Sequence, residues 1–213
     1  MMKCWLSAMA FVVIAGVADA HDGVKHDSAE DAAKHRAEVD PPAPDTEPFP
    51  FGFGGAFLLT DQTGAPRTEA DPDGHMQLIF FGYANCPAIC SAALPTMAEI
   101  AAASTAAGVP VTPVMITVDP ARDTVEGMVA PLAELSPSII GLTGSEDELA
   151  EVRKLFRVER KHVFDDPDYG PIFSHGSHIY LMDGEGRFKT LMPPITSPER
   201  GVEIVAKYAG AEG

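Results

Sequence analysis

The sequence predicts an α/β domain whose central strands are parallel. Residues 78–81 form an unbroken apolar run, typical of a strand buried on both faces, and a turn and a helix follow directly. Residues 111–118 form a second apolar strand after that helix. A strand, a helical crossover and another strand give a parallel pair. The chain of 213 residues is long enough to bury a sizeable core around such a sheet.

The elements around the central strand follow from local signals. Residues 51–64 indicate a strand that ends in a polar turn, and we expect it to be one arm of an N-terminal hairpin. The helix after the central strand is predicted from near Ile89 to about Ala107, where Gly108 and Pro110 end it. The predicted sheet is therefore preceded by a short β-rich extension.

The second strand is followed by a turn at residues 119–124. Asp and Thr side chains accept hydrogen bonds from the first N–H groups of a helix. We therefore expect Asp123 or Thr124 to cap a helix that ends near Leu135.

A short strand is predicted at residues 139–142, and a helix opens after it. Ser145 and Glu148 have the spacing of a capping box, in which each side chain bonds a backbone N–H of the first helical turn. The polar stretch at residues 160–173 is predicted to be a mobile loop.

The C-terminal elements are a hairpin and a helix. Strands are predicted at residues 178–182 and 187–192, joined by a tight turn, and Ser197 with Pro198 begins a final helix to about residue 209. The order strand, helix, strand, helix, hairpin, helix is that of the thioredoxin fold. The predicted fold is thus thioredoxin-like, with an extra N-terminal β-hairpin, over residues 51–213.

Residues 1–20 are predicted to be a secretory signal peptide. Lys3 precedes an apolar stretch at residues 5–17, and Ala18-Asp19-Ala20 fits a cleavage site. The alternative is an uncleaved membrane anchor, although the apolar run is short for a span. Export predicts a periplasmic location, with attachment to the membrane only if the leader is retained.

Residues 21–50 are rich in Asp, Glu, Ala, His and Pro, and we interpret them as a disordered linker. Its His21, His26 and His35 could hold Cu(II), or could belong to a solvated tail. The whole chain has a formal net charge of −16, which argues against nucleic-acid binding.

Cys86 and Cys90 are the two cysteines that remain after removal of the leader. Two are too few for a disulfide scaffold, so chemistry is the more natural use. Both lie where a strand passes into a helix, and the positive end of a helix favours a thiolate. Residues four apart share a helix face, so both sulfurs can point at one object, either each other or a metal ion.

The Cys-x-x-x-Cys spacing leaves room for a soft metal ion between the sulfurs. An imidazole would complete a trigonal Cu(I) site, and His175 and His178 compete for this place. His175 is preferred because it lies in the flexible loop 174–177, whereas His178 begins a strand on the same face as Tyr180.

The chain resembles the SCO/SenC family of copper chaperones, which serve the dinuclear copper centre of cytochrome c oxidase. The resemblance rests on motifs in family order at residues 81–90, 118–124, 141–144, 156–158, and His175 five residues before Tyr180-Leu181. It implies that copper is held by Cys86, Cys90 and His175. It also implies that the partner is the oxidase subunit with the copper centre, with other copper chaperones or thioredoxin-like reductants as further partners.

One motif of the resemblance contains Asp119, Arg122 and Asp123. In the family this loop lies near the metal site. The alternative is a structural role, as a helix cap and a local ion pair.

The chain departs from the usual family pattern at three positions. Ala88 and Ser174 stand where the family usually has acidic residues, and Ser91 stands where it usually has proline. The loss of two carboxylates removes repulsion on nearby thiolates and contacts for a partner. These departures bear on the choice of partner more than on copper.

Two functions follow. In the first, the chain delivers copper outside the cytoplasmic membrane. In the second, it is a thiol–disulfide oxidoreductase that reduces cysteines of the oxidase subunit or other exported proteins, with Cys86 attacking and Cys90 resolving. A structural disulfide between the two cysteines is the third reading.

Overall fold

The structure is a computed structural model that describes residues 52–84, 86 and 90–210. The predicted leader (1–20) and linker (21–50), with their histidines, lie outside the described residues. Within the described part of the chain, no helix combines the length and apolar character that a membrane span requires.

A seven-stranded sheet forms the centre of the described domain, with strand order β2-β1-β5-β4-β3-β8-β9. The strands β3, β4 and β5 are parallel, and antiparallel pairs flank them on both sides. The strands are β1 (Leu58–Asp61), β2 (Pro66–Thr68), β3 (Met76–Gly82), β4 (Val111–Thr117), β5 (Ile140–Thr143), β8 (Ile179–Met182) and β9 (Phe188–Met192). This sheet, with β1 and β2 as the N-terminal hairpin, confirms the predicted α/β, thioredoxin-like fold.

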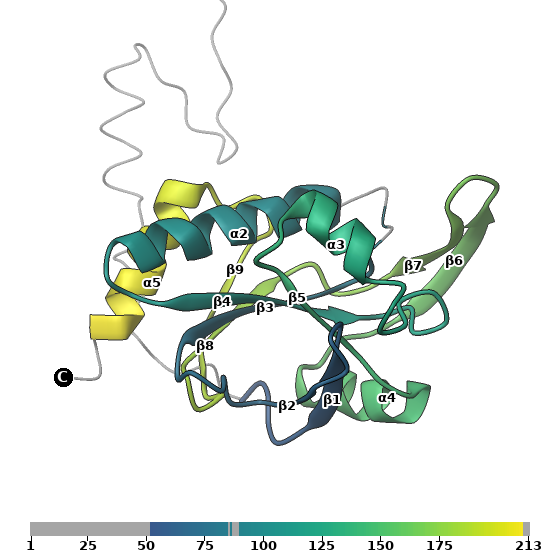
Figure 1. Ribbon diagram of the computed structural model, residues 1–213, viewed down its shortest axis with the longest axis horizontal. Coiled ribbons are helices and arrows are strands. Elements are labelled where there is room, and N and C mark those ends of the chain that lie inside the picture. The colour runs from purple at the N-terminus through teal and green to yellow at the C-terminus, as the bar shows by residue number, and fades with distance from the viewer. Residues whose placement is uncertain (1–51, 85, 87–89, 211–213) are drawn as a thin grey trace, which may run out of the picture. The chain divides into compact units, whose positions relative to one another are not determined.

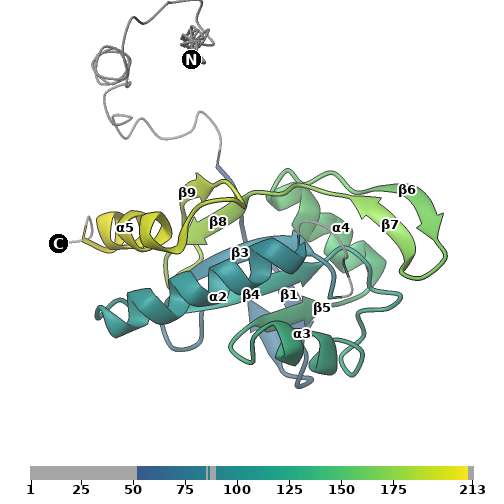
Figure 2. The same ribbon diagram turned by 90° about the horizontal axis from the view of Figure 1, so that it is seen from above.

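Helices cover both faces of the sheet. The helices are α2 (Cys90–Ala106), α3 (Val129–Leu135), α4 (Glu146–Leu155) and α5 (Pro198–Ala209). In Figure 1, α2, α3 and α5 lie above the sheet and α4 lies below it, and the view in Figure 2 agrees. Every residue of β3 is buried as a result, which explains the uninterrupted apolar run in the sequence.

Two of the predicted helix starts are confirmed. Ser145 and Glu148 form the complete capping box at the start of α4. Ser197 accepts a hydrogen bond from the backbone N–H of Arg200, with Pro198 as the first residue of α5. These ends were predictable because a cap involves only neighbouring residues.

The prediction of a loop at residues 160–173 is wrong. This segment is an antiparallel hairpin of β6 (Lys161–Asp166) and β7 (Gly170–Ser174), which form a separate two-stranded sheet. Both figures show it beyond the end of the main sheet. Nearly all of β6 is exposed, so its sequence lacks the alternation of polar and apolar residues that marks a half-buried strand.

The predicted cap of the helix that ends near Leu135 is also wrong. The helix α3 begins at Val129, and the residue before it, Met128, makes no side-chain cap. The Thr124 hydroxyl instead accepts a hydrogen bond from the N–H of Gly127 at 3.0 Å within the preceding turn. Asp123 is buried and points inward, as described below. The cap was predicted because nothing in the neighbouring sequence shows that the Asp123 side chain is buried and bonded to other segments.

The turn between β8 and β9 makes the stability of the fold depend on pH. The carboxylate of Asp183 accepts hydrogen bonds from the N–H groups of Glu185 (3.0 Å) and Arg187 (2.9 Å), and from Arg187 Nε (2.8 Å). Burial raises the pKa of Asp183, but these bonds outweigh burial and hold its pKa below the ordinary value of 3.8. A carboxyl whose pKa is lowered on folding stabilises the fold above its unfolded pKa, and this stabilisation is lost as the pH falls.

We therefore expect Asp183→Asn to lower the free energy of unfolding at pH 7. The loss of stability between pH 5 and pH 3 should also be smaller in this variant than in the wild type. Urea unfolding at a series of pH values measures both effects. Glu185→Gln, which removes an exposed carboxylate from the same turn, is the control. Equal pH dependence in the wild type and Asp183→Asn would contradict this prediction.

Candidate metal centre

Two thiols lie where β3 passes into α2. As predicted, both cysteines lie at this passage: Cys86 follows the strand, and Cys90 is the first residue of α2, close to the predicted start near Ile89. Both are buried, with 8% of Cys86 and 1% of Cys90 exposed, and no disulfide joins them. Cys86 is therefore the more exposed of the two residues.

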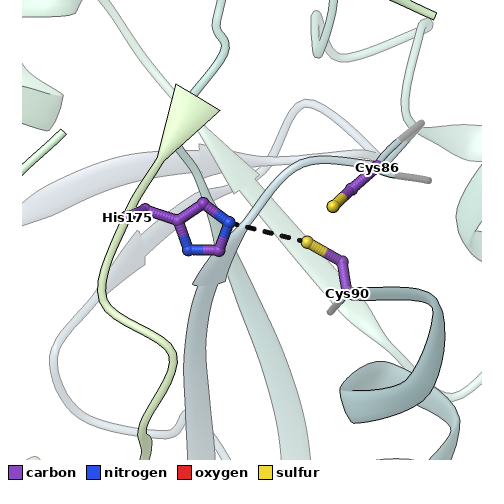
Figure 3. A group of neighbouring side chains, drawn as sticks. All are labelled: Cys86, Cys90 and His175. Atoms are coloured by element: carbon purple, nitrogen blue, oxygen red, sulfur yellow. Dashed lines mark hydrogen bonds between the residues drawn. The ribbon is translucent and has the colours of Figure 1, made fainter. Parts of the chain in front are cut away.

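His175 reaches the two sulfurs from a different part of the chain. It follows the last residue of β7, Ser174, and its Nε2 lies 3.8 Å from Sγ of Cys90. The sulfur atoms of Cys86 and Cys90 and a ring nitrogen of His175 all lie within 4.8 Å of one another (Figure 3). His178, the competing histidine, is exposed and outside this group. The structure thus brings together the three residues that the sequence analysis selected.

The orientation of the His175 ring follows from a second hydrogen bond. Its Nδ1 lies 3.0 Å from the carbonyl oxygen of Gly176. A carbonyl oxygen can only accept a hydrogen bond, so Nδ1 carries the proton and is the donor. In the neutral ring this leaves the lone pair on Nε2, the nitrogen that faces Cys90. The imidazole is thus in the tautomer that a metal ligand requires.

Two aromatic side chains hold the ring of His175. Phe80 and Tyr83 pack against it in T-shaped contacts, with centroid distances of 5.8 Å and 6.1 Å. No role for these aromatic residues was predicted from the sequence. The available signal was their position, within six residues before Cys86 at the end of a buried strand.

The thiol of Cys90 does not behave as the sequence analysis expected from its helix position. A hydrogen bond with Cys86, burial, and the charge of Cys86 together raise the pKa of Cys90 well above 9.0. These effects outweigh the helix N-terminus, so Cys90 retains its proton in the metal-free protein. A metal ion that binds here must displace that proton.

Tyr83 adds a polar group beside the thiols. Burial, followed by the charge of Cys86 and a hydrogen bond with it, raises the pKa of Tyr83 to about 12. The phenol therefore stays protonated and can donate toward the sulfur of Cys86.

Asp123 holds the start of the cysteine turn. Its carboxylate accepts hydrogen bonds from the N–H of Ala84 (3.0 Å) and the hydroxyl of Thr117 (2.6 Å), and its carbonyl accepts one from Thr143 (2.6 Å). Burial raises the pKa of Asp123 despite the bonds from Thr117 and Ala84. The sequence suggested two structural roles for this motif, a helix cap and a local ion pair. The ion pair, between Arg122 and Asp119, is confirmed.

The three positions that depart from the family pattern lie differently. Ser91 and Ser174 are exposed, and Ala88 lies outside the described residues. The exposure of the two serines is consistent with an effect on partners, and this effect stays a prediction.

A second group of donor atoms occurs at Asp71, Asp73 and His75, within 4.8 Å of one another. Its geometry has a local explanation. Oδ1 of Asp71 accepts hydrogen bonds from the backbone N–H groups of Asp73 (2.9 Å) and His75 (3.2 Å), as in a turn capped by an aspartate.

Comparison with known proteins decides the family. The model of the family described as SCO1/SenC matches residues 45–210, most of the chain. The chain belongs to the SCO1/SenC family. The resemblance seen in the sequence is confirmed.

Relatives within the SCO1/SenC family include curated proteins and a solved structure. Protein sco1 of Schizosaccharomyces pombe is 42% identical over 163 residues, which cover 73% of this chain and 60% of that protein. An SCO2-like protein of Rickettsia conorii is 35% identical over 156 residues, covering 72% of this chain and 75% of the relative. The structure of Bradyrhizobium japonicum ScoI with copper bound matches with a TM-score of 0.64 and 36% identity, over 73% of this chain and 99% of that one.

Proposed function

We propose that this chain binds one copper ion through Cys86, Cys90 and His175 and delivers it to the dinuclear copper centre of cytochrome c oxidase. The observation that carries the proposal is the meeting of two thiols and one imidazole nitrogen within 4.8 Å. Membership of the SCO1/SenC family and the copper-bound structure of a relative support it.

The donor set fits copper. Thiolates are soft ligands that favour Cu(I), and imidazole is a common copper ligand. For comparison, a nitrogen and a sulfur ligand of one zinc ion, at about 2.1 Å and 2.3 Å from the metal, lie at most about 4.4 Å apart. The 3.8 Å between Cys90 Sγ and His175 Nε2 is within this limit, so an ion requires little rearrangement there.

The exposure of the three residues favours transfer by ligand exchange. Cys86 and Cys90 are buried, whereas His175 is half-buried and follows the end of a hairpin. An incoming ligand of the acceptor would therefore replace His175 first, while the two sulfurs retain the ion. The predicted leader supports delivery in the periplasm, from a protein that is exported or anchored by that leader.

The second candidate function is thiol–disulfide exchange. The thiolate of Cys86 would attack a disulfide of an exported protein, which forms a mixed disulfide and releases one partner thiolate. Cys90, once its proton has passed to that thiolate, would attack the sulfur of Cys86 and release the second partner sulfur. The Cys86–Cys90 pair is oxidised to a disulfide and the partner is reduced to a dithiol. The greater exposure of Cys86 and the retained proton of Cys90 favour this order. Copper and this disulfide exclude each other, because they use the same sulfurs.

His175→Ala distinguishes the two functions. We expect the reduced wild type to bind one Cu(I) per chain, and the variant to bind it at least about 10-fold more weakly, because loss of an outer contact of a metal site already costs about 10- to 100-fold and this variant loses a ligand. Its rate of disulfide exchange should be nearly unchanged. Competition with a chromophoric Cu(I) chelator measures the affinity, and reduction of a model disulfide measures the exchange.

His178→Ala is the matched control, because it removes an exposed histidine three residues away. It should leave both measurements unchanged. Cys86→Ala should weaken Cu(I) binding and abolish exchange. If the wild type retained no copper but cycled its Cys86–Cys90 disulfide readily, the oxidoreductase would replace the copper chaperone as the proposed function.

A further inference from the structure

Arg122 connects the turn after β4 to the hairpin that precedes His175. Its Nη2 donates a hydrogen bond to the carbonyl oxygen of Pro171 at 2.8 Å, and its Nη1 donates to the carbonyl oxygen of Tyr169. These two carbonyls lie on either side of Gly170, the first residue of β7. The Nε of Arg122 donates a hydrogen bond to the buried carboxylate of Asp119, and this bond anchors the guanidinium.

The same guanidinium also contacts the wall of the candidate metal centre. Its central carbon lies 5.4 Å from the centroid of the Tyr83 ring. Tyr83 in turn packs against His175 and is hydrogen bonded to Cys86. Arg122 therefore touches both the hairpin that leads to His175 and an aromatic ring that contacts both His175 and Cys86.

In the described part of the chain, the hairpin pairs with no strand of the main sheet. A two-stranded sheet is at best marginally stable by itself, and β6 and β7 are hydrogen bonded as strands only to each other. Phe173 adds contacts with the Tyr83 ring (6.1 Å) and with Arg160 (4.0 Å). The bonds from Arg122 fix the backbone at the start of β7, five residues before His175.

We propose that Arg122 is a positioning residue that sets the location of His175 relative to the two sulfurs. The inference rests on the proposed function in one respect, because the consequence for the ion is a higher affinity for copper. Lysine cannot replace arginine here, since one ammonium group cannot reproduce a planar fork that bonds two carbonyls and a carboxylate while facing an aromatic ring. The role is thus specific to the guanidinium and not to its charge.

A double-mutant cycle with His175 tests this role. Arg122→Ala should raise the Kd for Cu(I) about tenfold, because misplacing a ligand has an effect comparable to loss of an outer contact of a metal site. In a His175→Ala background, Arg122→Ala should change the Kd little, since the side chain through which Arg122 acts is already absent. Arg122→Lys should show most of the loss, and it serves as the test variant if Arg122→Ala does not fold.

Nuclear magnetic resonance of the metal-free full chain supplies a readout that does not depend on copper. The imidazole signals of His175 should shift or broaden in Arg122→Lys, whereas those of His178 should stay unchanged. Arg187→Ala is the matched control. Like Arg122, Arg187 donates a hydrogen bond through Nε to a buried aspartate in a turn, here Asp183 at 2.8 Å. Its turn, however, is the one that joins β8 to β9. Arg187→Ala should leave the His175 signals and the Kd unaltered.

Two results would overturn the inference. One is an equal loss of Cu(I) affinity from the Arg122 substitution with and without His175, which would show that the effect does not pass through His175. The other is an unchanged set of His175 signals in Arg122→Lys. A wild type that binds no Cu(I) would instead refute the proposed function, and the His175 signals would still decide whether Arg122 positions that ring.

Discussion

Cys90→Ser is expected to lower the affinity for Cu(I) by more than about 100-fold, because loss of an outer contact of a metal site already costs about 10- to 100-fold and this variant loses a ligand. A serine hydroxyl is a hard donor and stays protonated at neutral pH, so it cannot replace a thiolate toward Cu(I). Cys90 also supplies the sulfur that lies 3.8 Å from Nε2 of His175. Chelator competition on the reduced protein measures the change.

Ser91→Ala is the control for this experiment, because Ser91 is the next residue of the same helix and is exposed. It should bind Cu(I) as the wild type does. Circular dichroism shows whether each variant is folded. If Cys90→Ser were folded and still held one Cu(I) with wild-type affinity, the assignment of Cys90 as a ligand would be wrong.

Gly186→Ala is expected to lower the free energy of unfolding by about 3 kcal/mol, from left-handed backbone strain and from overpacking. Gly186 has a φ of +77° in the turn between β8 and β9. A Cβ there would lie 2.6 Å from the carbonyl oxygen of Glu69. That oxygen accepts a hydrogen bond of 2.8 Å from Nε2 of the buried Gln77, so it cannot move away freely.

Gly64→Ala separates the two contributions. Gly64 also has a positive φ, +85°, but a Cβ there would meet no atom within 4 Å. This variant should lose only the backbone part, about 1 kcal/mol. Chemical unfolding of both variants measures the difference. Similar losses in the two variants would show that the contact with Glu69 carries no energy.

The residues of the candidate metal centre were predictable to different degrees. Cys86 and Cys90 stood out because a buried strand followed by a helix start is a local pattern. His175 was preferred over His178 by its loop, and the resemblance to the SCO/SenC family named it as well. The structure places all three side by side, and their role as ligands remains a prediction that the variants above test.

The errors of structure concern an exposed hairpin and a buried carboxylate whose partner is distant in the sequence. The hairpin of β6 and β7 was taken for a loop because an exposed strand has no hydrophobic pattern. It is held partly by Arg122, whose hydrogen-bond acceptors Tyr169 and Pro171 lie 47 and 49 residues away. Asp123 was taken for a helix cap because a cap is the common local use of such a side chain, whereas its carboxylate bonds Ala84, 39 residues earlier.

Sequence patterns predicted the central strands, the C-terminal hairpin, the helix caps at Ser145 and Ser197, and the resemblance to the SCO/SenC family. Each of these depends on the periodicity of apolar residues, on neighbours within one helical turn, or on motifs in a given order. The folded structure was needed to see that Nε2 of His175 faces Cys90, which lies 85 residues earlier, and that a hydrogen bond with Cys86 and burial raise the pKa of Cys90. The physical reason is that these properties arise from burial and from contacts between distant segments, which local patterns do not encode.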